Sequence, residues 1–223
     1  MEIGKYRNLT YIVKQPDYPQ KANPAILFLH GAGTRGSDIA SLEKNAFFSP
    51  DCCFTKDSSP FIVFAPQCHE DTWFDLFEQL KAFAMSIHND PRVDSKRLYL
   101  VGTSMGGYAT WQLAMSIPNI FAAAIPICGG GMQWNANRLV HLPIWAFHGK
   151  EDNVVPPEES IRMVAAVNRA GGTARLTLLE KTSHNVWNYA YSCHELLDWL
   201  LLQEKNEIPL ARQSSFYDTI AFG

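Results

Sequence analysis

The sequence predicts an α/β protein in which a mostly parallel, doubly wound sheet is flanked by helices on both faces. Short apolar runs recur along the 223 residues, and they lack the polar alternation of strands with one solvated face. Such runs are typical of strands buried on both sides, as in parallel sheets. Helical patterns separate them, and alternating strands and helices build this architecture. The expected strands are residues 25–29, 61–65, 97–101, 122–128, 143–147 and 175–179.

Two helical patterns and one weaker strand complete the prediction. Apolar residues recur at helical spacing over residues 73–87, with polar and charged residues opposite. Residues 156–170 form a second amphipathic pattern, with Glu158 and Glu159 in its first turn. Residues 9–13 are expected to add an antiparallel edge strand. Ligands of doubly wound sheets bind at the carboxyl ends of the strands, so we expect functional residues directly after the apolar runs.

Composition indicates one domain with one well-buried core. Hydrophobic residues make up 47% of the chain and charged residues 18%, below the roughly 25% charged share of soluble domains. We expect a catalytic domain over residues 1–203 and a polar tail over residues 204–223. The 19 Lys and Arg against 22 Asp and Glu give a net charge of −3, with no basic block. Nucleic acid is therefore not an expected partner.

The amino terminus and the cysteines favour a cytoplasmic protein. No apolar stretch follows a basic head at the start of the sequence, so we expect no signal peptide. The apolar runs are far shorter than the roughly 18 residues of a membrane span, so no membrane partner is expected. Five cysteines make an odd number without CxxC spacing, which favours reduced thiols. These patterns leave the oligomeric state open.

A candidate nucleophile follows the predicted strand at residues 97–101. The segment Gly102-Thr103-Ser104-Met105-Gly106-Gly107 has the form G-x-S-x-G-G and precedes an apolar helical segment. In a strand-to-helix elbow, small residues two places before and after the serine leave room for a sharp, strained turn that presents the hydroxyl. We therefore predict Ser104 as the nucleophile; the alternative is a glycine-rich turn without chemistry.

A serine nucleophile needs a base and a carboxylate that orients the base. Asp152 follows the strand at 143–147, and His184 follows the strand at 175–179. The order Ser104, Asp152, His184 is the order of serine, acid and base in hydrolases with this elbow. Glu151 stays open as an alternative acid and His148 as an alternative base.

A glycine motif after the first parallel strand has two interpretations. Residues 31–36 contain a literal G-x-G-x-x-G, which suggests a dinucleotide site. That site needs an acidic residue at the end of the next strand, and the strand at 61–65 has none there. The alternative is an oxyanion hole made of backbone N–H groups. We predict the N–H groups of Ala32 and Met105 for this role, with Gly33 as the substitute for Ala32.

Taken together, the segments at the strand ends resemble a known family. The chain is similar to single-domain α/β-hydrolases of the carboxylesterase, phospholipase-like and "predicted peptidase" type, related to prolyl oligopeptidase and to feruloyl and polyhydroxybutyrate esterases. The resemblance implies an α/β-hydrolase fold, a Ser104, His184, Asp152 triad, and ester hydrolysis through an acyl-enzyme without metal or organic cofactor. Ser183 stands where many members have glycine. The matching segments are residues 28–38, 65–68, 102–108, 128–131, 146–149, 152–156 and 183–184, together with Trp187.

The expected function is that of a serine esterase acting on small-molecule carboxylic esters. Trp73, Tyr108, Trp134 and Trp187 lie in or near strand-end loops, and we expect them to form an apolar substrate pocket. The strands use most of the chain, so little remains for a lid or cap. Two alternatives stay open, namely a peptidase or amidase of prolyl oligopeptidase type, and a non-catalytic binding protein on a hydrolase scaffold.

Overall fold

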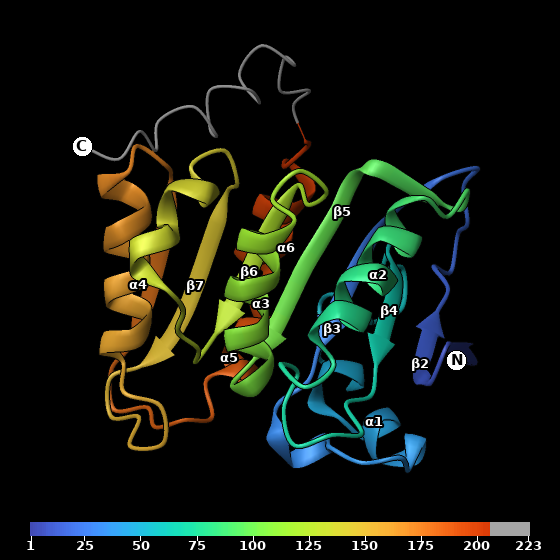
Figure 1. Ribbon diagram of the computed structural model, residues 1–223. Coiled ribbons are helices and arrows are strands. Elements are labelled where there is room, and N and C mark those ends of the chain that lie inside the picture. Colours follow the sequence, from blue (N-terminus) through green and yellow to red (C-terminus); the bar gives the residue numbers. More distant parts are fainter. Residues whose placement is uncertain (206–223) are drawn as a thin grey trace.

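A computed structural model describes residues 1–205, and its centre is one eight-stranded sheet (Figure 1). The strand order is β1-β2-β4-β3-β5-β6-β7-β8. The pairs β1–β2 and β2–β4 are antiparallel, and every other neighbouring pair is parallel. The carboxyl ends of β3 to β8 therefore lie along one edge of the sheet. The strands are Glu2–Tyr6 (β1), Leu9–Lys14 (β2), Asn23–Leu29 (β3), Ile62–Pro66 (β4), Val93–Thr103 (β5), Ala123–Ile127 (β6), Ile144–Gly149 (β7) and Ala174–Leu179 (β8).

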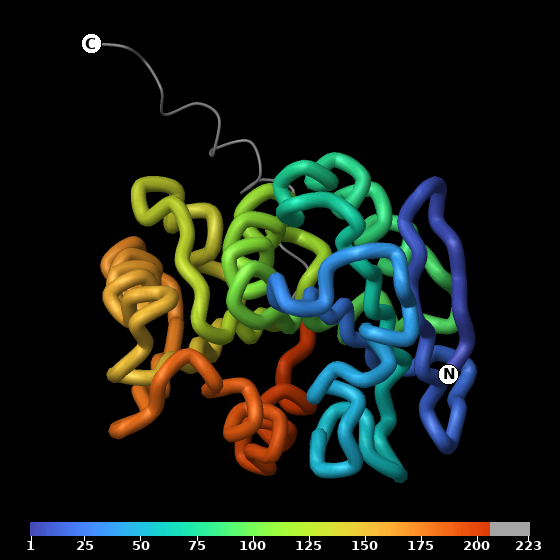
Figure 2. The backbone as a smooth tube through the Cα atoms, turned by 90° about the horizontal axis from the view of Figure 1, so that it is seen from below, coloured from blue at the N-terminus to red at the C-terminus, as the bar shows by residue number. Residues whose placement is uncertain are grey.

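Helices cover both faces of this sheet (Figure 2). One face carries α2, α3, α4 and the 3₁₀ helix η3, and the other carries α1, α5, α6 and the short helix η2. The 3₁₀ helix η1 lies directly beyond β3. The bounds are Ala32–Thr34 (η1), Ile39–Glu43 (α1), Ala46–Phe48 (η2), Phe77–His88 (α2), Met105–Ser116 (α3), Gln133–Leu139 (η3), Glu158–Arg169 (α4), Trp187–Ser192 (α5) and His194–Leu201 (α6).

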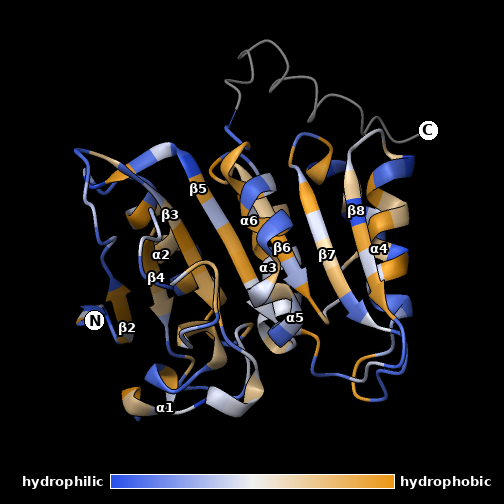
Figure 3. Ribbon diagram, turned by 180° about the vertical axis from the view of Figure 1, so that it is seen from behind, coloured by the Kyte–Doolittle hydropathy of each residue, from blue (hydrophilic) through white to orange (hydrophobic). Residues whose placement is uncertain are grey.

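Strand β3 explains why the apolar runs lack alternation. Leu27 and Leu29 pack into the core beneath α2, α3 and α4, whereas Ile26 and Phe28 pack into the core beneath α1, α5 and α6. Both side-chain rows of the strand are fully buried. The interior strands are accordingly dominated by apolar residues (Figure 3). The predicted fold class is confirmed: this is an α/β-hydrolase fold.

Two elements differ from expectation. The predicted edge strand at residues 9–13 is antiparallel, but β1 pairs along its outer side, so β2 is an interior strand. Helix α2 begins at Phe77 rather than at residue 73, because Asp75 accepts hydrogen bonds from the backbone and hydroxyl of Thr72 in a preceding turn. Most of the expected polar tail, residues 204–223, lies outside the described residues.

Within residues 1–205, no helix is both long enough and apolar enough to cross a lipid bilayer.

Candidate active site

Ser104 stands on a sharp turn between β5 and α3. Its backbone has φ 53° and ψ −116°, a sparsely populated conformation for a residue with a side chain. The turn requires glycine at position 106, because a Cβ there would lie 1.9 Å from the backbone oxygen of Leu29. The predicted strand-to-helix elbow is therefore present, and Ser104 is partly exposed at the carboxyl edge of the sheet.

The structure brings the three predicted catalytic side chains into one hydrogen-bonded chain. His184 Nε2 lies 2.8 Å from Ser104 Oγ, and His184 Nδ1 lies 2.7 Å from Asp152 Oδ2. Asp152 follows β7, and His184 is in the loop after β8, so the residues come from the carboxyl ends of β5, β7 and β8, with β6 between the first two. A base that contacts both a hydroxyl and an orienting carboxylate has the geometry needed to activate a nucleophile.

Hydrogen bonds to Asp152 favour the ionised form of its carboxylate. Its other carboxylate oxygen accepts hydrogen bonds of 2.9 Å from the backbone N–H groups of Val154 and Val155. Burial opposes ionisation, but the hydrogen bonds from His184 and from these two N–H groups outweigh it and lower the pKa of Asp152. The alternative acid, Glu151, is exposed. Asp152, not Glu151, is thus the carboxylate in contact with the candidate base.

His148 lies on the other side of the same carboxylate. Its Nε2 is 3.2 Å from Asp152 Oδ2, and both side chains are fully buried. The same nitrogen is 2.9 Å from the carbonyl oxygen of Val155, which accepts its proton, and Nδ1 contacts the hydroxyl of Ser160 at 2.7 Å. Ser160 also donates to the carbonyl of Gly129. His148 is therefore placed to hold Asp152 in position, and its contacts do not include Ser104. The sequence indicated that His148 follows a strand, but it did not indicate the direction of the ring.

The loop predicted to stabilise an oxyanion packs against the nucleophile. A Cβ added to Gly31 would lie 3.4 Å from the Cβ of Ser104. Ala32 begins η1 and Met105 begins α3, and the first N–H groups of a helix have no acceptor within that helix. Both predicted N–H groups therefore belong to helix starts beside Ser104.

His30 and Trp73 support this loop, a role that sequence reasoning missed for both. His30 Nδ1 donates to the carbonyl of Gly31 at 2.7 Å, and its Nε2 accepts the N–H of Cys68 at 2.9 Å. Burial lowers the pKa of His30 to about 4, so the ring is neutral near pH 7. Trp73 is fully buried and donates to the carbonyl of His30 at 3.0 Å. Trp73 therefore does not line a substrate pocket as we expected, because its ring is beneath the loop.

The other predicted pocket residues have different positions. Tyr108 lines a cleft of about 470 Å³. Trp187 packs edge-on against His184, with the two ring centroids 5.5 Å apart. Trp134, in η3, is 80% exposed and is not part of the lining of that cleft. The cleft is also lined by Phe74 and Met132.

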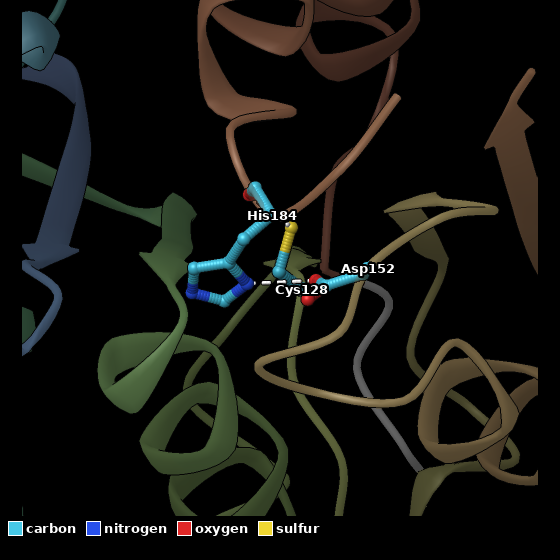
Figure 4. A group of neighbouring side chains, drawn as sticks. All are labelled: Cys128, Asp152 and His184. Carbon is cyan, nitrogen blue, oxygen red and sulfur yellow. Dashed lines mark hydrogen bonds and ion pairs between the residues drawn. The ribbon is translucent and has the colours of Figure 1, made fainter. Parts of the chain in front are cut away.

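Cys128 adds a thiol beside the acid and the base (Figure 4). Its Sγ donates to the carbonyl oxygen of His184 at 3.2 Å. One ligand atom each from Cys128, Asp152 and His184 lies within 4.8 Å of the others, close enough to hold a metal ion. However, burial, reinforced by the charge of Asp152, raises the pKa of Cys128 to about 12. A metal ion would have to displace the thiol proton and the proton shared by His184 and Asp152, so the group fits a metal poorly.

Fold and site geometry are those of an α/β-hydrolase, and comparison with known proteins narrows the class. Residues 62–192, more than half of the chain, match the model of the dienelactone hydrolase family. The chain belongs to this family. The matched region includes Ser104, Asp152 and His184, and it begins after the loop that contains Ala32.

Similar individual proteins include several esterases. The crystal structure of a thermostable esterase superposes with a TM-score of 0.77 at 32% identity, over 91% of this chain and 62% of that one. Est2 of Thermogutta terrifontis shares the fold, with a TM-score of 0.67 at 19% identity over 90% of this chain and 93% of that one. The bifunctional acetylxylan esterase/xylanase XynS20E of Neocallimastix patriciarum is 39% identical over 64 residues, which are 28% of this chain and 9% of that protein. The chain thus spans less than two thirds of the thermostable esterase and a small part of XynS20E.

Proposed function

We propose that this protein is a serine hydrolase that cleaves carboxylic esters through an acyl-enzyme. The observation that carries the proposal is the hydrogen-bonded chain from Ser104 Oγ through His184 to Asp152. Family membership and the similarity to a thermostable esterase support ester hydrolysis as its reaction.

The geometry suggests a role for each group. His184 Nε2 takes the proton of the Ser104 hydroxyl as its oxygen attacks the ester carbonyl, and Asp152 stabilises the resulting imidazolium. The N–H groups of Met105 and Ala32 hold the oxyanion of the tetrahedral intermediate. His184 then protonates the leaving alcohol, and water, activated by the same histidine, releases the acid from Ser104. Each proton taken from a nucleophile is returned to a leaving group, so the cycle balances within the chain's own residues.

Substitution of Ser104 tests this proposal directly. The Ser104→Ala protein should hydrolyse p-nitrophenyl acetate at least about 1,000-fold more slowly than the wild type, because loss of a triad member removes the nucleophile. A fluorophosphonate probe should label the wild type and not the variant. Wild-type activity in Ser104→Ala, or an unlabelled and inactive wild type, would overturn the proposal; the latter result would favour a binding protein on a hydrolase scaffold.

A peptidase is the less favoured alternative. The chain resembles an acylaminoacyl peptidase of Pyrococcus horikoshii with a TM-score of 0.63 at 14% identity, but it spans only 40% of that chain. Comparing an ester and an anilide of the same acyl group would separate the two activities, and we expect the ester to be cleaved much faster. We further propose a cytoplasmic location, supported by the five free thiols.

A further inference from the structure

A cleft on the α3 side of the nucleophile combines aromatic walls with one carboxylate. Its volume is about 470 Å³, and its apolar lining includes Phe74, Phe77, Tyr108 and Met132. Glu159, from the first turn of α4, is the single carboxylate in the lining, and no lysine, arginine or histidine is among these residues. The fixed charge of the cleft is therefore negative.

Tyr108 lines the cleft and follows the nucleophile closely in the chain. Its N–H donates to the carbonyl of Ser104 at 3.0 Å, so Tyr108 lies one helical turn after Ser104. Burial raises the pKa of Tyr108, and the negative charges of Glu159 and Asp152 raise it further. Tyr108 is thus within electrostatic reach of both carboxylates, and its phenol is neutral near pH 7.

The Glu159 carboxylate faces the cleft. Within residues 1–205 it has neither a hydrogen bond nor an ion pair, although the side chain is partly buried. Gly130 makes room for it, because a Cβ at that position would lie 2.1 Å from Glu159 Oε2. Glu159 lies in the first turn of α4. Partial burial of a carboxylate without a cation is unfavourable, and a cationic ligand would compensate it.

We propose that this cleft binds a positively charged group of the ester substrate, an ammonium or alkylated ammonium on an apolar body, and disfavours carboxylated esters. Two features of the lining select such a group. Glu159 supplies the opposite charge, and the rings of Phe74, Phe77 and Tyr108 supply faces that attract cations. The apolar walls accommodate the alkyl substituents of such a ligand. A strongly hydrated polyol would gain little from apolar walls. This inference rests on the proposed esterase function.

Two matched substrate series test the charge preference. In the first, p-nitrophenyl esters carry acyl chains of equal length that end in trimethylammonium, tert-butyl or carboxylate. In the second, acetate esters carry the same three groups on the alcohol, and the release of acid measures their hydrolysis. In at least one series, kcat/KM of the wild type should be about threefold to tenfold higher for the cation than for its neutral isostere, and lower for the anion. The preference should weaken with added salt.

Glu159→Gln should bring the cationic-to-neutral ratio close to one, since it removes the charge and keeps the shape. Glu158→Gln is the matched control, because it removes the same charge from the same helical turn at an exposed neighbour that does not line the cleft. This control should keep the wild-type ratio within about twofold. Equal ratios in wild type and Glu159→Gln in both series would overturn the inference.

Hydrolysis of p-nitrophenyl acetate distinguishes a failure of the cation-site inference from a failure of the proposed esterase function. Wild-type hydrolysis of the acetate, abolished in Ser104→Ala, without any charge preference, would overturn only the cation site. Absence of hydrolysis of every ester by the wild type would overturn both proposals.

Discussion

His148 Nε2 lies 3.2 Å from Asp152 Oδ2, so this carboxylate oxygen is flanked by two imidazole rings, one from His148 and one from His184. Only His184 contacts the Ser104 hydroxyl. His148 is buried beneath the site and bonds to Val155 and Ser160 instead. Its contacts assign it a positioning role: it orders the segment that aims Asp152 at the base.

His148→Leu should therefore impair catalysis and stability without affecting substrate binding. We expect kcat to fall about tenfold and the free energy of unfolding to fall by about 1–3 kcal/mol, because buried partners lose their hydrogen bonds. KM should stay within about twofold, since the ring does not reach the substrate. Ester hydrolysis kinetics and urea unfolding measure these effects, and the exposed His194→Leu is the control. An unchanged kcat in a folded His148→Leu protein would contradict the positioning role.

Protonation of His30 should make stability depend on pH. The folded pKa is about 4 against an unfolded value of 6.5, so between these values only the unfolded chain binds the proton. Stability is then highest above pH 6.5 and falls as the pH decreases toward 4. The His30 contribution predicts a loss of about 2 kcal/mol between pH 7 and pH 5. Urea unfolding at both pH values would measure it, and His30→Gln should show a smaller loss. Equal losses in the two proteins would argue against a buried neutral His30.

The contact between Gly106 and Leu29 should tolerate no side chain. Both atoms that a Cβ at position 106 would strike first belong to the backbone of Leu29, at 1.9 and 2.5 Å. Gly106→Ala must therefore move α3 away from β3, and we expect a loss of about 3 kcal/mol or more in the free energy of unfolding. Gly33→Ala is the matched control, since nothing lies within 4 Å of a Cβ there, and it should change stability by less than about 0.5 kcal/mol. Thermal unfolding of both variants checks the contrast.

The sequence was most informative where one local pattern decides the structure. Unbroken apolar runs predicted the interior strands, and the convergence of parallel strand ends predicted that Ser104, Asp152 and His184 would meet. Strand β1 was missed because Glu2–Tyr6 is polar and largely exposed, and its Gly4 is covered by the ring of Tyr11. Its pairing with β2 is a tertiary contact without an apolar signature.

Side-chain direction could not be predicted in the same way. Trp73 belongs to an apolar stripe near the strand ends, a position consistent with either a pocket or the core. Its indole N–H donates to the carbonyl of His30, which places it in the core. Glu159 was expected only as a first-turn helix acid. Its place in the cleft depends on the space that Gly130 leaves, and Gly130 is too distant in the sequence for a local pattern to indicate this contact.

The strand order also has a kinetic consequence. Leu27 of β3 pairs with Leu100 of β5, and Phe147 of β7 pairs with Thr177 of β8. Parallel pairings between such distant segments must overcome loop-closure entropy before they gain contacts, so they form slowly. Helices can form early in refolding, whereas the proton path from Ser104 to Asp152 requires β5, β7 and β8 to be assembled together. Recovery of esterase activity should therefore lag behind recovery of the helical circular dichroism signal. The recovered activity would then report the rate of the final folding step.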